Sequence, residues 1–138
     1  MKLFIDTNVV IDVIASREPF VDDSRAIFNL CESGKVEGRI SALTFCTVSY
    51  VLRKFVQPGT MRIKLSEFRN VLIPIDLTVS VLDKALSSSI SDFEDAVQFY
   101  TAVYSDADYI ITRNVKDFPQ DSIPVLTPKE FLLCYNDE

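Results

Sequence analysis

The sequence predicts an α/β fold, a three-layer sandwich in which a central parallel sheet of about five strands is flanked by helices. Short apolar runs alternate with amphipathic runs of helical length from one end of the chain to the other. Continuous apolar strands separated by helices are typical of a mainly parallel sheet that is covered on both faces. No repeat, linker or break in composition divides the 138 residues, so we expect a single domain spanning residues 1–138.

The first half of the chain is expected to form two strands and four helices. The strands are residues 2–5 and 37–41, and the helices are residues 8–15, 21–33, 43–56 and 61–70. The first helix closes before Pro19, and the second, with apolar residues at helical spacing, stops at Gly34. Residues 43–56 are apolar on most sides, so we expect this helix to be well buried and to end at Pro58-Gly59.

The second half is expected to add three strands and three helices. The strands are residues 71–75, 109–112 and 123–126, and the helices are residues 80–88, 91–105 and a last helix from residue 127. Ser91 and Glu94 fit the S-x-x-E capping box that opens many helices. Thr127, Pro128 and Glu130 supply a threonine cap, a proline at the first helical position and a glutamate at the third.

Composition excludes several kinds of protein. The chain has no histidine, which rules out Ser-His-Asp and Cys-His hydrolases and H-E-x-x-H zinc enzymes. Its three glycines form no phosphate-binding loop, and its three cysteines, far apart among apolar residues, are expected to be buried free thiols. No run approaches the roughly 20 apolar residues of a membrane span, and no signal-peptide pattern opens the chain. We therefore expect a soluble cytoplasmic protein that does not associate with membranes.

Charge is unevenly distributed along the chain. The net charge of −6 has the wrong sign for nucleic-acid binding through bulk electrostatics. Residues 52–70 nevertheless carry only one acid and five cations, which are Arg53, Lys54, Arg62, Lys64 and Arg69. These cations are either ordinary solvated helix faces or a track for the phosphates of a nucleic acid.

Carboxylates stand where ligands bind in parallel sheets, beyond the carboxyl ends of the strands. Asp6 directly follows the first strand, where it is either the N-cap of the next helix or a functional group at the edge of the core. Asp92 and Asp95 lie at the start of a helix, a place that favours negative charge in any case. A metal-binding role for Asp95 stays open on this evidence.

A third polar group follows the fourth strand. Thr112 ends that strand and Asn114 follows it, and Val115 and Phe118 are expected to hold the next turn against the core. Asn114 and Asp117 would then face the strand ends. An oxygen-rich site drawn from the three groups suits Mg²⁺ or Mn²⁺ and does not suit zinc.

Three motifs resemble the PIN domain family, which includes the toxins of VapBC toxin–antitoxin pairs. They are F-I-D-T-N-V-V-I-D-V near the N-terminus, F-E-D-A-V-Q-F-Y-T-A late in the chain, and D-Y-I-I-T-R-N-V-K-D-F after it. The resemblance implies a Rossmann-like parallel sheet and hydrolysis of RNA phosphodiesters with Mg²⁺ or Mn²⁺. It also implies a cognate antitoxin as partner, and many family members are homodimers.

The resemblance also implies roles for particular residues. Asp6 matches the first acid of the family and Asp95 the acid of the late helix, so both are expected to be catalytic. Asn114 falls at the last position, where members carry Asp or Asn, and Asp117 follows close by; all four are expected metal ligands. Second-tier candidates are Asp92, Glu94, Asn8, Thr112 and Asp12. Candidates to bind the phosphates of RNA are Arg53, Lys54, Arg113 and Lys116.

The chain departs from the family at one position. Members usually carry a glutamate in the helix after the second strand, but no carboxylate occurs between Arg39 and Ser66. The candidates to substitute for it are Asp92, Glu94 and Asp12. This departure favours a second hypothesis, a catalytically weakened PIN-like module that binds RNA or a protein.

A third hypothesis is a receiver-like phosphoacceptor domain. Asp76 ends the third strand, where a receiver carries its phosphorylated aspartate, and Thr112 ends the fourth. A receiver also needs an acidic pair after its first strand, whereas Asp6 is followed by Thr7 and Asn8.

Overall fold

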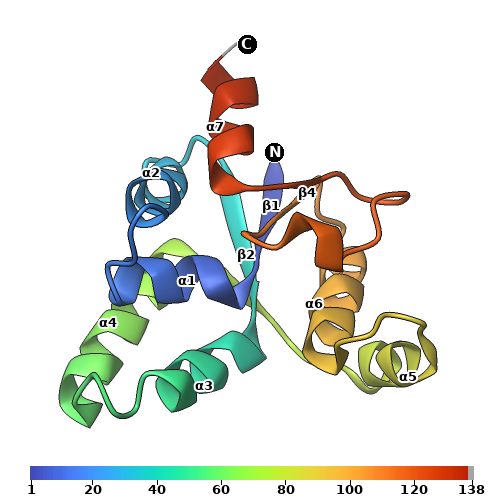
Figure 1. Cartoon of the computed structure of the whole chain (residues 1–138), viewed down its shortest axis with the longest axis horizontal. Helices are drawn as coiled ribbons and strands as arrows, with labels where there is room; N and C mark the ends of the chain where they lie inside the picture. The colour runs from blue at the N-terminus through green and yellow to red at the C-terminus, as the bar shows by residue number, and fades with distance from the viewer. Residues whose placement is uncertain (137–138) are drawn as a thin grey trace.

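The computed structural model describes residues 1–136, which form a five-stranded parallel sheet with the order β3-β2-β1-β4-β5 (Figure 1). The strands are β1 (Lys2–Ile5), β2 (Glu37–Ser41), β3 (Ile73–Ile75), β4 (Tyr109–Ile111) and β5 (Val125–Leu126). All four strand pairs are parallel. The predicted sheet is confirmed. Its order differs from the 2-1-3-4-5 order of receiver domains, so the phosphoacceptor hypothesis is wrong.

Within residues 1–136, six α-helices and one 3₁₀ turn connect these strands, and a seventh α-helix follows β5. They are α1 (Thr7–Ile14), α2 (Val21–Glu32), α3 (Ala42–Val51), α4 (Pro58–Val71), α5 (Val79–Ser87), α6 (Phe93–Tyr104), η1 (Val115–Asp117) and α7 (Pro128–Asn136). Figure 1 shows α1, α2 and α4 on one side of the sheet and α5 and α6 on the other. Among residues 1–136, no helix combines the length and apolar character needed to cross a membrane.

Two cores lie on opposite faces of the sheet, and β1 contributes to both. Leu3 and Ile5 pack into the core beneath α1 and α2, while Phe4, between them in sequence, packs with Phe99 of α6 on the other face. All three β1 residues are fully buried. Side chains alternate between the faces of a strand, so a continuous apolar run is what a sheet covered on both faces requires.

One glycine is needed for close packing at the edge of this core. A Cβ atom on Gly38 of β2 would lie 2.5 Å from Leu72 Cδ2 and 2.7 Å from Cys31 Sγ, so no larger residue fits without displacing them. Cys31 is buried there as expected. Cys46 and Cys134 are exposed, so the prediction of buried thiols is wrong for these two.

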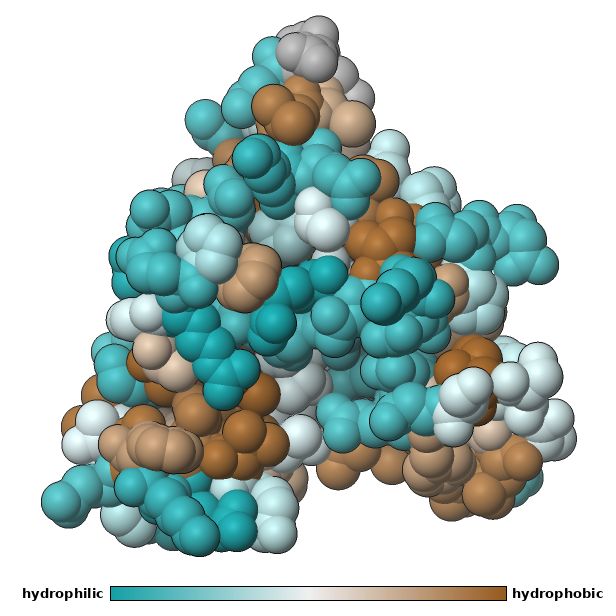
Figure 2. All heavy atoms as spheres, viewed as in Figure 1, coloured by the Kyte–Doolittle hydropathy of each residue, from teal (hydrophilic) through white to brown (hydrophobic). Residues whose placement is uncertain are grey.

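Helix α3 differs most from its prediction. It ends at Val51, and only Thr44 and Val48 within it are buried. Tyr50 near the end of α3 is exposed, and Phe55 in the segment that follows the helix is 82% exposed. Apolar composition alone does not say which faces of a helix are covered. Figure 2 shows the resulting apolar surface near α3 and α4, with a second one over α5.

Two helix starts also differ from the prediction, and one is confirmed. Pro58 begins α4 instead of ending the preceding helix, since proline fits the first helical turn. The capping box at Ser91 is wrong: Asp92 is the N-cap of α6 and accepts a hydrogen bond from the Asp95 backbone N–H at 3.0 Å. The predicted capping pattern at the start of α7 is present between Thr127 and Glu130.

Candidate active site

Asp6 lies where β1 meets α1, and it is both a helix cap and a buried functional group. Its Oδ1 accepts a hydrogen bond from the Thr7 backbone N–H at 2.8 Å, and the side chain is only 5% exposed. Its Oδ2 accepts a hydrogen bond from Thr112 Oγ1 at 2.8 Å. The Asp6 backbone N–H is bonded to Ile111 O, which fixes the end of β1 beside the end of β4.

Burial makes the charge of Asp6 costly. Desolvation raises its pKa from the ordinary 3.8 to about 6, although the hydrogen bonds from Thr112 and Thr7 act in the opposite direction. Within the described part of the chain, no lysine or arginine forms an ion pair with this carboxylate. Asp6 is thus a buried acid held in place by two donors but without an ion-pair partner, and the charge of Arg113 lowers its pKa by less than burial raises it.

Asp95, in the first turn of α6, faces the same region from the other side of the sheet. Its pKa is raised to about 7, chiefly by desolvation and then by the charges of Asp6, Asp92, Asp117 and Glu94. Figure 2 shows hydrophilic side chains across the middle of this face, between α1 and α6. The acids predicted at the strand ends therefore come close enough to repel one another.

An open cavity of about 470 Å³ lies beside Asp95. Asp92, Asp117 and Lys116 also line it, whereas Asp6 is buried and does not line it. The cavity combines three carboxylates with one cation, so it offers acceptors for a cation and one donor for a phosphate.

The donor atoms suit a hard divalent cation, which prefers oxygen ligands. Repulsion between Asp6 and Asp95 is also the kind of electrostatic cost that a bound cation removes. Nevertheless, residues 1–136 contain no group of three or more Asp, Glu, Cys or His side chains arranged to hold a metal ion. The oxygen ligands and the repulsion between Asp6 and Asp95 thus suit a divalent cation, but the carboxylates are not arranged as a complete metal site.

The turn after β4 organises the remaining polar groups. Thr112 is fully buried and accepts hydrogen bonds from Asn8 Nδ2 at 3.3 Å and from the Asn114 backbone N–H at 3.1 Å. Phe118 is buried below η1, as predicted, and the side chains of Asn114 and Asp117 are exposed above it. Thr112 therefore connects Asp6, α1 and the turn that carries the third group of candidate ligands.

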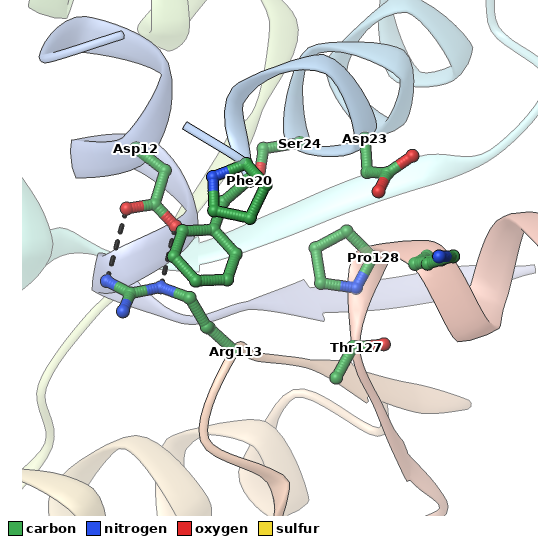
Figure 3. Close-up of a pocket in the computed structure, with 9 residues that line it drawn as sticks. Asp12, Phe20, Asp23, Ser24, Arg113, Thr127 and Pro128 are labelled. Carbon is green, nitrogen blue, oxygen red and sulfur yellow. Dashed lines mark hydrogen bonds and ion pairs between the residues drawn. The ribbon is translucent and has the colours of Figure 1, made fainter. Parts of the chain in front are cut away.

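Asp12, a second-tier candidate, is engaged in a buried ion pair. Arg113 Nε and Nη2 donate to its two carboxylate oxygens at 2.8 and 3.1 Å. The Arg113 guanidinium also lies 4.5 Å from the ring centre of Phe20 (Figure 3). The guanidinium of Arg113, a candidate for RNA binding, is thus engaged by Asp12 and Phe20.

The other candidate cations are exposed. Arg53 stacks on Tyr50, with its guanidinium carbon 4.0 Å from the ring centre, and donates a hydrogen bond to the Tyr50 carbonyl. Lys54 follows it just beyond the end of α3, while Lys116 belongs to η1. Only Lys116 lines the cavity beside Asp95. RNA binding by Arg53 and Lys54 stays a prediction.

Comparison with known proteins identifies the family. The family model of the PIN domain matches residues 2–116. This chain belongs to the PIN domain family. The match includes β1 to β4 and both of the acids, Asp6 and Asp95, that the motifs had indicated.

Relatives of this PIN domain match it over nearly its whole length. It is 27% identical over 140 residues to Ribonuclease VapC1 of Aquifex aeolicus (strain VF5), covering 98% of this chain and 96% of that protein. A toxin–antitoxin complex from Klebsiella pneumoniae contains a chain 25% identical to it, with a TM-score of 0.67 and coverage of 91% of this chain and 97% of that one. VapBC2 from Rickettsia felis, bound to a DNA fragment from their promoter, gives a TM-score of 0.70 at 18% identity, with coverage of 91% and 97%.

In this PIN domain a network without charge lies in the region where the glutamate was expected. Thr44 of α3 shares a 2.9 Å hydrogen bond with Thr7, and Gln98 Nε2 donates to both hydroxyl oxygens, at 2.8 and 3.2 Å. All three residues are buried. Sequence reasoning missed them, although Gln98 lies three positions after Asp95 and so shares its face of α6. The network ties α1, α3 and α6 together below the acidic residues.

Proposed function

We propose that this PIN domain is a divalent-metal-dependent endoribonuclease and the toxin of a toxin–antitoxin pair. The observation that carries this proposal is the approach of Asp6 and Asp95 at the carboxyl ends of the strands: both acids are partly or fully buried, and the charge of Asp6 raises the pKa of Asp95. The likeness to a ribonuclease over 98% of the chain supports the same reaction.

Each acid has a defined part in this proposal. Asp6, held by Thr7 and Thr112, and Asp95, at the start of α6, would hold the metal ion, with Asn114 or Asp117 completing the set. A bound divalent ion lowers the pKa of a water nucleophile and offsets negative charge on the phosphate, which removes the need for histidine. Lys116 lies beside these acids and would bind the phosphate of the RNA.

The identity of the ion belongs to the proposal as well. PIN ribonucleases depend on divalent metal ions, and we propose Mg²⁺ or Mn²⁺ here, because every candidate ligand is an oxygen. Asp92 and Glu94 are the carboxylates that could replace the missing glutamate. The charges of both raise the pKa of Asp95, so both lie near it. Asn8 has a supporting part, because its side chain bonds to Thr112 and to the Arg113 backbone N–H.

Cleavage of single-stranded RNA, with and without added metal, tests the activity. The protein should cut RNA with Mn²⁺ or Mg²⁺ and lose this activity in EDTA. Asp95→Asn should be inactive, whereas Asp83→Asn, an exposed acid on α5, should cut like the unmodified protein. Equal cleavage by the two variants would show that the site is elsewhere.

The second candidate is a module that binds RNA without cleaving it. The observation that favours it is the incomplete cluster, because residues 1–136 hold no formed group of three metal-binding side chains. Fluorescence anisotropy with labelled RNA separates the two functions. RNA binding that is unaffected by metal, together with no cleavage in any metal, would establish the binding module and reject the nuclease.

An antitoxin partner is part of the toxin proposal. The related chain from Klebsiella pneumoniae comes from a toxin–antitoxin complex. Exposed apolar side chains on and after α3, Tyr50 and Phe55 among them, provide surface of the kind that protein partners cover. Co-expression with the product of the neighbouring reading frame should yield a stable complex in which RNA cleavage is suppressed; a product that neither binds nor inhibits would argue for a solitary nuclease.

A further inference from the structure

Asp6 and Asp95 belong to helices that share no apolar core. Asp6 caps α1, whose buried residues Val9, Val10 and Ile11 pack in the core beneath α1 and α2. The buried apolar residues of α6 pack instead with β4, β5 and α5. Figure 1 shows the two helices on opposite sides of the sheet. Direct apolar packing between α1 and α6 therefore does not set the distance between the two acids.

One side-chain hydrogen bond joins α1 to α6. Gln98 Nε2 donates to Thr7 Oγ1 at 2.8 Å, and no other hydrogen bond or ion pair within residues 1–136 connects these two helices. Both ends of this bond lie beside an acid. Thr7 follows Asp6 and donates its backbone N–H to Asp6 Oδ1, while Gln98 lies one turn after Asp95 on α6. The bond thus links the segment that holds Asp6 to the helix that carries Asp95.

Thr44 of α3 completes this link as the third member of the uncharged network. Gln98 Nε2 carries two hydrogens and donates to Thr7 Oγ1 and to Thr44 Oγ1, and these two hydroxyls also share a hydrogen bond. Each of the three atoms is therefore bonded to the other two. The network fixes the starts of α1 and α3 relative to the turn of α6 that follows Asp95.

The amide of Gln98 has a cost that packing does not explain. Gln98 is 2% exposed, and its Oε1 has no hydrogen-bond partner among residues 1–136. A buried polar atom without a partner is unfavourable, and replacing buried polar groups by apolar ones of the same shape can be neutral or stabilising. Local exceptions of this kind are expected at functional sites. The amide thus indicates a role for Gln98 other than stabilising the fold.

The absence of charge in this network matters because of its neighbours. The charge of Asp6 raises the pKa of Asp95, so the two acids repel each other. A lysine or arginine at position 98 would compete with a bound cation for these acids, and a carboxylate would add to the repulsion. An amide and two hydroxyls hold the helices together without either effect.

We propose that Gln98 is a positioning residue for the candidate metal site: its bonds to Thr7 and Thr44 keep Asp95 near enough to Asp6 for both carboxylates to bind one divalent cation. Gln98 acts through the two acids and is not itself a ligand. This inference rests on the proposed function, in which Asp6 and Asp95 hold the metal ion.

The affinity for Mn²⁺ in the absence of RNA provides the first test. Electron paramagnetic resonance measures free Mn²⁺ in the presence of wild-type protein or of Gln98→Met, whose side chain is of similar length but cannot donate to the hydroxyls. We expect the Kd for Mn²⁺ to rise roughly tenfold in Gln98→Met, as for the loss of a supporting partner in a metal site. An unchanged Kd, or a wild-type protein that binds no Mn²⁺, would overturn the inference.

Thr101→Val supplies a matched control on the same helix. Thr101 is also buried on α6, but its hydroxyl donates only to the Val97 carbonyl one turn earlier. Urea unfolding should show that Gln98→Met is no less stable than Thr101→Val, whereas Mn²⁺ affinity should fall only in Gln98→Met. An equal loss of affinity in the two variants would assign the effect to a general loosening of α6 and would contradict a positioning role.

Variants of Thr7 test whether the bond itself matters. Thr7→Val keeps the backbone N–H that donates to Asp6 but removes the hydroxyl, so it should weaken Mn²⁺ binding as Gln98→Met does. Thr7→Ser retains a hydroxyl and should keep the wild-type affinity. Because Thr7→Val and Gln98→Met remove the same bond, the double variant should bind Mn²⁺ no more weakly than the weaker single variant. Full additivity of the two losses would show that the residues act separately, which would refute the inference.

RNA cleavage by the same variants separates this inference from the nuclease proposal. If wild-type protein binds Mn²⁺ more tightly than Gln98→Met but cuts no RNA, the nuclease proposal fails and the positioning role stands. If wild-type protein cuts RNA, and Gln98→Met needs no more Mn²⁺ for half-maximal cleavage, the positioning role fails alone.

Discussion

Two buried aspartates belong to the region of α1 and have opposite surroundings: Asp6 is the N-cap of the helix, and Asp12 lies within it. Asp12 is fully buried and meets Arg113 through two charged hydrogen bonds, whereas Asp6, 5% exposed, has hydrogen-bond donors but no ion-pair partner in the described chain. A paired buried charge holds structure together. A buried carboxylate that has no ion-pair partner and lies beside other acids is costly to ionise, and a bound cation would lower that cost. We therefore assign a structural role to the Asp12–Arg113 ion pair and a functional role to Asp6.

The largest expected effect is on catalysis. Asp6→Asn should reduce metal-dependent RNA cleavage by more than the roughly 10–100-fold that loss of a supporting partner costs a metal site. Its free energy of unfolding should not fall, because the variant removes an uncompensated buried charge. Asp12→Asn should show the reverse, with cleavage retained and stability reduced. If the Asp6→Asn variant cleaves RNA at the normal rate, Asp6 has no role in catalysis and the contrast with Asp12 is wrong.

The next effect is on stability. Arg113→Met should lower the free energy of unfolding by about 3 kcal/mol, because it leaves Asp12 charged and buried without a partner. Adding Asp12→Asn to this variant should restore much of the loss. Urea unfolding of the two single variants and the double variant measures the coupling. If the effects of the two single variants simply add, the Asp12–Arg113 ion pair does not stabilise the fold.

Stability should also depend on pH in a defined direction. Native Asp6 and Asp95 have pKa values of about 6 and about 7, above the ordinary 3.8, so the folded protein binds protons more tightly than the unfolded chain. In EDTA, stability should therefore fall as the pH rises from about 4 to about 7. Asp12 and Glu94 are shifted in the same direction.

Thermal unfolding at several pH values checks this slope. Mn²⁺ should stabilise the protein mainly above pH 7, where the acids are ionised, and Asp6→Asn should flatten the metal-free slope. A melting temperature that rises with pH over this interval would contradict the raised pKa values.

The smallest expected effect concerns the support of Asp6. Thr112→Val removes the hydroxyl that donates to Asp6 Oδ2 and should cost about 1.5 kcal/mol at pH 8. Without this bond the pKa of Asp6 should rise further, so more Mn²⁺ should be needed for half-maximal cleavage. Thr47→Val on α3, whose hydroxyl bonds only its own helix, is the matched control and should change neither quantity. An unchanged Mn²⁺ requirement in Thr112→Val would assign Thr112 to folding alone.

Much of the fold could be predicted because it depends on local patterns. Apolar runs placed all five strands to within two residues, and strand ends and helix starts indicated Asp6 and Asp95. The surroundings of these acids could not be read in the same way. Arg113 lies 101 positions from Asp12 in the sequence, and Gln98 lies 91 positions from Thr7. Such contacts exist only because β4 pairs with β1 and α6 packs beneath it.

The burial of apolar residues in helix α3 could not be predicted from the sequence either. Its composition suggested burial on most faces, yet Tyr50 and Phe55 are exposed on and after it. Whether an apolar face is covered depends on what other elements pack against it, and periodicity in one segment does not contain that information.

The sequence by itself determined the order of strands and helices, the presence of acids at the strand ends, and the exclusion of chemistry that depends on histidine. Only the tertiary structure decided which acids would be neutralised. Asp6 and Asp12 are the same residue type, one capping α1 and one within it, but burial and the distance to a cation control the cost of a charge. Those two quantities arise from the packing of distant segments, so the fold alone separates the structural role of Asp12 from the functional role of Asp6.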